Sequence, residues 1–205
     1  EGYDFLGLMT GSEGLLGVIT EVTVKILKTP EVVKAALVGF PTIEDAGNCV
    51  AKIIASGCIP AGMEIMDKAL TKATNDYCKA GYPTDAEAMM IVEFDGTEHE
   101  VEAFIQKVKQ IAEKNNSSSL KISKSNEERL KFWAGRKAAF PACGVLAPDY
   151  MCMDGSIPRG KLAEVLNEIS RLSKKYELPV ANAFHAGDGN LHPLIMFDAN
   201  NKESL

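Results

Sequence analysis

Two histidines enclose a short glycine-rich stretch near the end of the chain, in the sequence His-Ala-Gly-Asp-Gly-Asn-Leu-His from His185 to His192. The pair Asp188-Gly189 favours a two-residue β-hairpin turn, because both central positions of a type I′ turn need positive φ. That turn would place His185 directly opposite His192, with Cβ atoms about 5 Å apart on one face. We therefore expect the two imidazoles to form a clamp for a divalent metal ion.

The ligand types narrow the choice of metal, since imidazoles without a nearby cysteine suit Zn²⁺, Mn²⁺ or Fe²⁺. Two ligands do not complete a site, so a third, a carboxylate, must come from elsewhere in the protein. The competing interpretation is that both histidines flank an ordinary hairpin and only form hydrogen bonds. The chain has three histidines, and the third, His99, falls at a charged helix start where a surface position is expected.

The bulk composition excludes several classes of protein. With 46% hydrophobic residues, a chain of 205 can bury a sizeable core. A formal net charge of −6 argues against nucleic acid as a partner, which requires clustered positive charge. The five cysteines are scattered without a C-x-x-C pair, which fits a reducing, cytoplasmic compartment. No apolar run approaches the roughly 20 residues of a transmembrane helix, and no signal peptide is evident.

Strands and helices are expected to alternate from residue 31 almost to the end. Capping patterns at Thr42, Thr97 and Ser125 each mark a helix start, and further helices are expected through 70–77 and from Pro158. A loop is expected over 141–148. The strands are predicted by short apolar or alternating runs at about 32–40, 62–66, 88–94, 120–122, 150–157, 179–185 and 192–197.

This alternation predicts an α+β fold, with helices packed on one face of a mainly antiparallel sheet in the ferredoxin-like manner. The first residues differ from the rest. The alternating apolar run over 18–26 has the period of a strand with one buried face, and Thr29-Pro30 then interrupts it. We therefore expect a domain boundary near Pro30, which separates residues 1–29 from residues 30–205.

Four motifs in the same order resemble the FAD-linked oxidases of the vanillyl-alcohol-oxidase superfamily, and the resemblance covers essentially the whole chain. It is strongest to the glycolate oxidase flavoprotein subunit and D-lactate dehydrogenase type. The motifs are the H-x-G-D-G-N-x-H signature within 182–194, the stretch 11–20, the segment Phe-Trp-Ala-Gly-Arg-Lys that contains Arg136, and the stretch 149–158.

The resemblance implies a role for each motif. Residues 1–29 would be the end of a PCMH-type FAD-binding domain, and residues 30–205 a substrate-side cap domain truncated at its C-terminus. His185 and His192 would ligate the metal, and Arg136 would bind the substrate carboxylate through its planar fork. The competing interpretation of Arg136 is an arginine on a helix surface. Backbone N–H groups would contact FAD at Gly11, Ser12, Gly14, Gly17, Val18 and Ile19.

The implied reaction is oxidation of a 2-hydroxy acid to the 2-oxo acid, with hydride transfer to FAD. Relatives that act on longer diacids carry a lysine where Cys152 stands and an asparagine where Leu194 stands. A small monocarboxylate, glycolate or lactate, is therefore favoured. Cys152 itself is expected to be a packed strand residue rather than a nucleophile, because nothing nearby in the sequence would activate it.

The resemblance also implies missing parts. The main FAD domain would precede Glu1, which is not a methionine. A Glu-His-Gly-Ile-Gly segment, with a further metal-ligand carboxylate and the histidine taken as catalytic base, would follow Leu205. We expect that the chain alone does not catalyse the reaction. Expected partners are an iron–sulfur subunit or an electron-transfer flavoprotein, and peripheral attachment at the inner face of the membrane is left open.

Two other functions remain as alternatives. A non-catalytic ferredoxin-like metal-binding or interaction module would take up metal without any flavin site. A related flavoenzyme for an aryl alcohol would have a mostly apolar pocket in which Arg136 does not contact the ligand.

Overall fold

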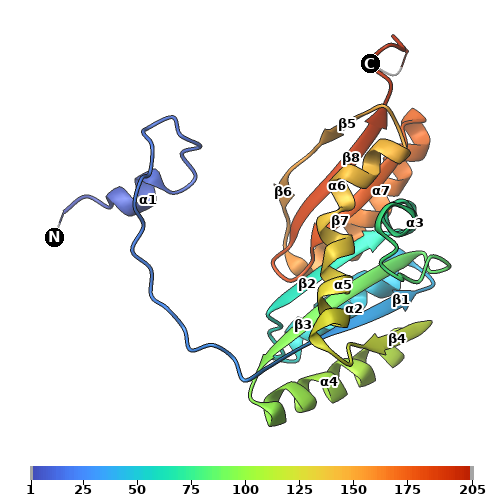
Figure 1. The fold of residues 1–205 in the computed structure, drawn as a ribbon. Helices are drawn as coiled ribbons and strands as arrows, with labels where there is room; N and C mark the ends of the chain where they lie inside the picture. The colour runs from blue at the N-terminus through green and yellow to red at the C-terminus, as the bar shows by residue number, and fades with distance from the viewer. Residues whose placement is uncertain (1, 204–205) are drawn as a thin grey trace.

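A computed structural model describes residues 2–203, and its body is one antiparallel sheet covered by helices (Figure 1). The strands form an eight-stranded sheet in the order β4-β1-β3-β2-β7-β8-β5, with β6 also paired to β8. Every pairing among these described strands is antiparallel, as the sequence predicts. The strands are β1 (Val32–Phe40), β2 (Gly62–Asp67), β3 (Ala88–Gly96), β4 (Ser119–Ile122), β5 (Asp149–Cys152), β6 (Gly155–Ser156), β7 (Val180–His185) and β8 (Asn190–Phe197).

The helices begin where the capping residues predict. Thr42 accepts a hydrogen bond from Asp45 N at the start of α2 (Ile43–Ala55), and Thr97 forms a full capping box on α4 (Glu98–Glu113). Ser125 caps α5 (Asn126–Lys137), but the Glu128 carboxylate accepts from Lys124 N, so the third box is not reciprocal. The other helices are α1 (Phe5–Met9), α3 (Lys68–Cys78), α6 (Ala139–Ala142) and α7 (Leu162–Tyr176).

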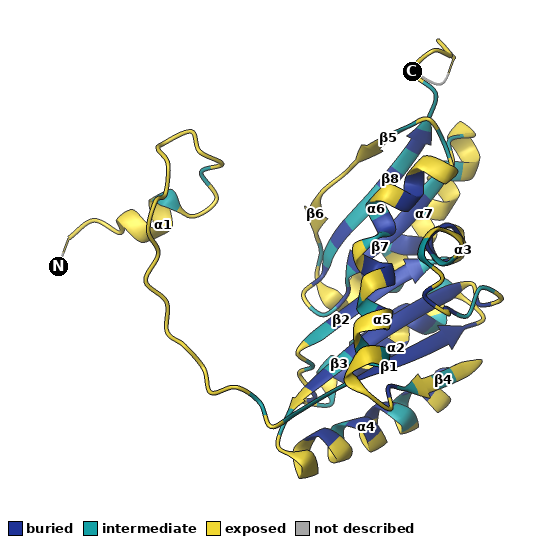
Figure 2. Ribbon diagram, viewed as in Figure 1, coloured by how far each residue is buried: buried dark blue, intermediate teal, exposed yellow. Residues whose placement is uncertain are grey.

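Helices cover both faces of the sheet, so the expectation of helices on one face is wrong. Strand β1 shows the reason, because Ala36, Val38 and Phe40 pack into one core with α2, α4 and α7. Ala35 and Leu37 point the other way, into a second core with α3, α5 and α6. Most residues of β1 and β3 are buried in continuous runs. This pattern is typical of strands that are covered by other elements on both faces of the sheet. Figure 2 shows these strands dark along most of their length.

The C-terminal half differs in detail from the sequence prediction. The strand expected over 150–157 is two short edge strands, β5 and β6. The expected loop over 141–148 contains α6 and a 3₁₀ turn at Cys143–Val145, and a second 3₁₀ turn at Arg159–Lys161 precedes α7. Among residues 2–203, no helix is both long enough and apolar enough to cross a bilayer.

The strand predicted over 18–26 does not form in this chain. Val18, Val22, Val24 and Ile26 are 68–86% exposed, and the segment stands away from the sheet (Figure 1). An isolated strand leaves its backbone groups unpaired, and no described strand pairs with this one. The alternating pattern is therefore present without the neighbour that would bury it.

Helix α5 lies unusually close to the loop that follows α3. A Cβ added at Gly135 would collide with the Tyr82 ring and its hydroxyl, and would approach Ala80 Cβ to 2.7 Å. The Tyr82 hydroxyl donates to the Phe132 carbonyl in this buried contact. The missing side chain at Gly135 thus fixes the height of α5 above the sheet.

We predict that Gly135→Ala destabilises the protein by about 1–3 kcal/mol, because overpacking outweighs the better helix propensity of alanine. Gly160→Ala is the control, since no atom lies within 4 Å of its added Cβ. Urea denaturation measures both free energies of unfolding. Equal stability of the two variants would contradict the close packing of α5.

Candidate functional site

Four ionisable side chains from four elements gather at one end of the second core. They are Glu64 from β2, Arg136 from α5, His185 from β7 and His192 from β8. Glu64 and His185 are direct partners in the β2–β7 register, so their side chains share a face. Arg136 reaches the same face from the helix above it.

The histidine hairpin has a different register from the one predicted. His185 lies opposite Asn190, and His192 lies opposite Ala183, so the expected direct His185–His192 pair is wrong. The two registers differ by two residues, and an even shift keeps every side chain on its original face. The rings therefore still meet, now as diagonal neighbours, with centroids 5.2 Å apart and planes at 88°.

The loop between the strands explains the shift. It has four residues rather than two, since Gly189 has φ of 82° but Asp188 is not in the positive region that a type I′ turn needs. Asp188 N and Gly189 N both donate to the His185 carbonyl, and the Asp188 carboxylate accepts from Asn190 N. Gly187 N also donates to Met63 O, which ties the loop to β2.

Glu64 joins the two kinds of predicted functional residue. Its Oε2 accepts from Arg136 Nε at 3.0 Å, and its Oε1 lies 2.7 Å from His185 Nδ1. Glu64 and Arg136 are each only 8% exposed. Burial of a charge is costly unless the charge is paired. Here Glu64 and Arg136 each compensate the buried charge of the other. The interpretation of Arg136 as a surface arginine is therefore wrong.

The Glu64 contact orients the ring of His185. An ionised carboxylate only accepts hydrogen bonds, so in the neutral ring Nδ1 would carry the proton and Nε2 would keep its lone pair. A histidine with a carboxylate behind it in this way is the usual form of a metal ligand. The His185 side chain is 44% exposed, so a ligand can reach it.

The second histidine is held more loosely. His192 Nδ1 lies 3.6 Å from Asp154 Oδ1, beyond hydrogen-bond distance, and Asp154 is 72% exposed. The Phe140 ring packs against His192 edge-on at 6.3 Å. Asn190, across from His185 on the same face, has a buried Oδ1 without a hydrogen-bond partner. That oxygen is an acceptor that a bound donor or cation would satisfy.

The described residues do not complete a metal site by themselves. Among residues 2–203, no group of three or more histidine, cysteine, aspartate or glutamate side chains is placed to hold one ion. The two imidazoles fit the donor set expected for Zn²⁺, Mn²⁺ or Fe²⁺, but the carboxylate ligand expected from elsewhere is not supplied here.

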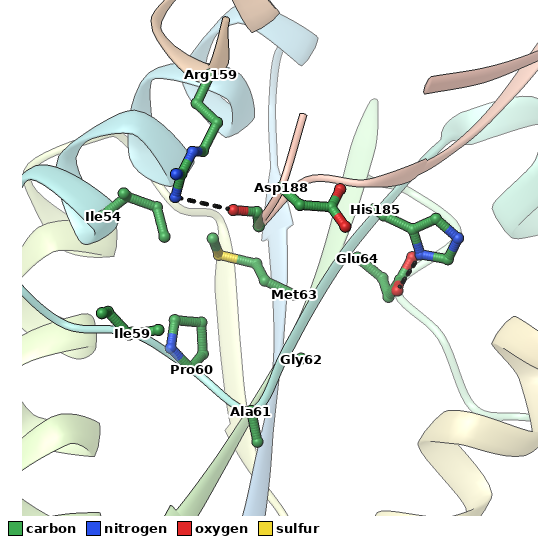
Figure 3. Close-up of a pocket in the computed structure, with 11 residues that line it drawn as sticks. Ile54, Ile59, Pro60, Ala61, Gly62, Met63, Glu64, Arg159, His185 and Asp188 are labelled. Atoms are coloured by element: carbon green, nitrogen blue, oxygen red, sulfur yellow. Dashed lines mark hydrogen bonds and ion pairs between the residues drawn. The ribbon is translucent and has the colours of Figure 1, made fainter. Parts of the chain in front are cut away.

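A hollow of about 310 Å³ opens beside this cluster (Figure 3). Glu64 and His185 lie at one end of it, and the backbone from Ile59 to Met63 forms its wall. At the other end Arg159 donates from Nη1 to the Gly187 carbonyl at 3.2 Å. In Figure 3 the His185 ring points away from Met63 and Ile54, and neither Arg136 nor His192 lines the hollow.

A second ion pair, between Glu93 and Arg129, supports α5 about two turns before Arg136. Glu93 on β3 accepts from Arg129 Nη1 at 2.8 Å and from Trp133 Nε1 at 2.5 Å. The Trp133 ring passes over Gly62, where an added Cβ would lie 3.1 Å from it. These contacts fix the rotation of α5 and so the direction in which Arg136 points.

The predicted flavin segment is not brought next to this cluster. Its residues are exposed except Ser12, which is half-buried, and Figure 1 shows the segment apart from the sheet. Gly11 and Gly14 have φ of 77° and 82°, and added Cβ atoms there would meet nothing within 4 Å. The backbone at these glycines is thus open to close approach by a cofactor, as the resemblance requires.

Two further predictions concern single residues. Cys152 is exposed on β5 rather than packed, so that expectation is wrong, because β5 is the outermost of the described strands at its end of the sheet. Burial, followed by the charge of Asp154, raises the pKa of its thiol, which does not favour a nucleophile. Cys152 pairs in register with the buried Leu194. His99 is exposed at the start of α4, as predicted.

Sequence reasoning missed Glu64, although a signal was present. It is the single charge among the apolar residues of the strand predicted over 62–66. An acidic residue is rarely buried without a partner, so a charge at such a position indicates a paired or functional group. Its partners come from residues 72 and 121 positions away, which no local pattern reveals.

Comparison with known proteins decides the family. The family model "FAD linked oxidases, C-terminal domain" matches residues 29–205. The chain belongs to this family. The glycolate oxidase subunit GlcD of Escherichia coli K12 is 53% identical over 199 residues, which are 97% of the chain and 40% of the relative. The chain thus spans about two fifths of the length of that relative.

Other relatives cover the chain in the same way. The glycolate oxidase subunit GlcD of Bacillus subtilis is 35% identical over the whole chain and 43% of its own length. The mitochondrial D-lactate dehydrogenase [cytochrome] of Arabidopsis thaliana is 36% identical over 98% of the chain and 36% of its own length. Family membership confirms the α+β fold and FAD as the cofactor of the family.

Solved structures agree on the fold alone. Alkyldihydroxyacetonephosphate synthase has a TM-score of 0.67 at 19% identity, and covers 95% of this chain with 42% of its own. p-Cresol methylhydroxylase has a TM-score of 0.65 at 14% identity, and covers 85% of this chain with 41% of its own.

Another carboxylate, that of the half-buried Asp67, lies at the C-terminal end of β2. It caps α3 by accepting from Leu70 N at 3.0 Å, and it accepts from Asn182 Nδ2 at 2.8 Å. Burial raises its pKa from 3.8 to about 6, against the lowering effect of these hydrogen bonds. Since the folded pKa is the higher one, its stabilising contribution is present below pH 3.8 and is lost as pH rises through about 6.

We predict that Asp67→Asn, which keeps the helix cap, removes this pH dependence. The free energy of unfolding of the wild type, minus that of the variant, should fall by up to about 3 kcal/mol between pH 4 and pH 7. Urea denaturation of both proteins at each pH measures the difference. A difference that stays constant would show that Asp67 does not titrate in this way.

Proposed function

We propose that this chain is the substrate-side part of a flavin-dependent 2-hydroxy-acid dehydrogenase, which oxidises glycolate or D-lactate to the 2-oxo acid. The observation that carries the proposal is the contact of one buried carboxylate, Glu64, with both Arg136 and His185. A cation for a substrate carboxylate and an imidazole for a metal are thereby fixed side by side. The names and identity of the relatives support the reaction class.

The proposal gives Arg136 the substrate carboxylate. Its Nε is occupied by Glu64, which leaves the two Nη groups as a planar fork for a bidentate contact. Nearby, the register pair Cys152–Leu194 offers no second cation or amide for a longer diacid. This favours a small monocarboxylate over a dicarboxylate.

The proposal gives His185 and His192 a divalent metal, Zn²⁺, Mn²⁺ or Fe²⁺, which would act as a Lewis acid toward the substrate hydroxyl. The adjacent rings and the Glu64 carboxylate 2.7 Å from Nδ1 of His185 support this assignment. FAD would accept the hydride, with backbone contacts at Gly11, Ser12, Gly14, Gly17, Val18 and Ile19. Electrons would leave to an iron–sulfur subunit or an electron-transfer flavoprotein.

The same proposal assigns the domains. Residues 1–29 would end the FAD-binding domain, which the exposed apolar run over 18–26 supports. Residues 30–205 would form the cap, with β1-α2-β2-β3-α4-β4 as a ferredoxin-like unit. The order β4-β1-β3-β2 and the antiparallel pairing support that unit.

The metal site is tested by Zn²⁺ titration of the chain in a calorimeter. We predict that His192→Ala weakens Zn²⁺ binding at least about tenfold, because half of the donor set is lost. His99→Ala is the matched control, since that histidine is exposed on α4. If all three proteins bind Zn²⁺ equally, the assignment of the metal to this hairpin is wrong.

The carboxylate site is tested in the intact flavoprotein that contains this chain, with glycolate, D-lactate and L-lactate as substrates. We predict that Arg136→Lys lowers kcat/KM for the preferred acid by about 100-fold, because a lysine cannot form the bidentate contact. Arg129→Lys, which alters the neighbouring pair, should lower it far less. Equal losses in both variants would mean that Arg136 only supports the fold.

A further inference from the structure

We propose that Glu64 is a positioning residue that fixes which nitrogen of His185 faces the metal and, at the same time, orients the Arg136 guanidinium. This inference rests on the proposed metal and carboxylate sites. Its basis is geometric, since one side chain that is 8% exposed contacts both residues, at 2.7 Å and 3.0 Å.

Only a carboxylate can serve both neighbours. Arg136 Nε–H is a permanent donor, because the guanidinium stays protonated in proteins. His185 Nδ1 must also be a donor if Nε2 is to bind a metal. Glu64 therefore needs two accepting oxygens, and it has one directed at each residue.

The isosteric amide cannot meet both demands. In Glu64→Gln, the amide oxygen would go to Arg136, since leaving a buried charged donor unpaired is the costlier alternative. The amide NH₂ would then face His185 Nδ1, which must become an acceptor. The ring proton would move to Nε2, the nitrogen that the metal requires without a proton.

The other histidine of the site is held less firmly. His192 has only Asp154 near its Nδ1, at 3.6 Å and 72% exposed, so this contact orients its ring weakly. The site thus depends on one firmly held imidazole and one loosely held imidazole. Glu64 determines the first of them.

Glu93 provides a matched control for Glu64. It lies on the neighbouring strand, two residues out of register with Glu64, and on the same face of the sheet. It also accepts from an α5 arginine, Arg129, in a pair with 18% side-chain exposure on both sides. Glu93 has its hydrogen bonds with Arg129 and Trp133, so Glu93→Gln removes a comparable ion pair without removing a contact of His185 or His192, the residues on which both measurements report.

The first measurement uses the metal-free chain labelled with ¹⁵N, at a pH about two units above the unperturbed histidine pKa of roughly 6.5. A ¹H–¹⁵N correlation spectrum of the imidazoles distinguishes the two tautomers, and three histidines make assignment simple. In the wild type and in the control variant Glu93→Gln, we expect the ring proton of His185 on Nδ1. We expect it on Nε2 in Glu64→Gln.

The second measurement is the Zn²⁺ affinity of the same three proteins. Glu64→Gln should weaken binding by about 10–100-fold, the usual effect of losing the carboxylate behind a ligand histidine. Glu93→Gln should stay within about twofold of the wild type. Thermal unfolding of both variants separates a loss of fold from a loss of positioning.

The outcomes separate this inference from the proposed function. A wild-type His185 with its proton on Nε2 overturns the role of Glu64, even if Glu64→Gln fails to fold. Unchanged affinity in Glu64→Gln, together with weak binding in His192→Ala, also overturns it but leaves the metal site standing. A tautomer switch without any effect of His192→Ala supports the positioning of His185 and overturns the metal proposal.

Discussion

The carboxylate of Glu64 is buried beneath α5, with one oxygen on Arg136 and the other on His185. A charge in such a place is tolerated only while both partners remain, because an unpaired buried charge costs several kcal/mol. The need for pairing also restrains the two partners of Glu64. Arg136 and His185 cannot leave their positions without exposing Glu64 to the same penalty. One ion pair therefore fixes two groups with different chemical roles in one geometry.

The fold supplies this geometry from three directions. The β2–β7 register sets Glu64 opposite His185, and the four-residue loop after β7 brings His192 alongside as a diagonal neighbour. Gly135 and Tyr82 set the height of α5, while Glu93 with Trp133 and Arg129 sets its rotation. The site is thus held by the rigid sheet and by one closely packed helix rather than by mobile loops.

Much of this arrangement follows from local sequence patterns. Helix starts at Thr42 and Thr97, the strands over 32–40, 62–66 and 88–94, and the placement of the two histidines on one face all rest on short-range rules, and these are confirmed. The exact hairpin register was not predictable, because Gly187 is held by Met63 of a distant strand. The placement of helices on both faces and the role of Glu64 likewise depend on contacts between residues far apart in the chain.

Family membership and the contacts of the buried Glu64 with Arg136 and His185 support the proposal that the chain presents a carboxylate-binding fork and a metal-binding imidazole side by side. A crystal structure of the chain soaked with Zn²⁺, with anomalous scattering used to locate the metal, tests this most directly. The account predicts an ion about 2.0–2.1 Å from Nε2 of both His185 and His192, with Glu64 still on Nδ1 of His185. An ion bound through Nδ1 of His185, or bound away from both rings, would contradict it.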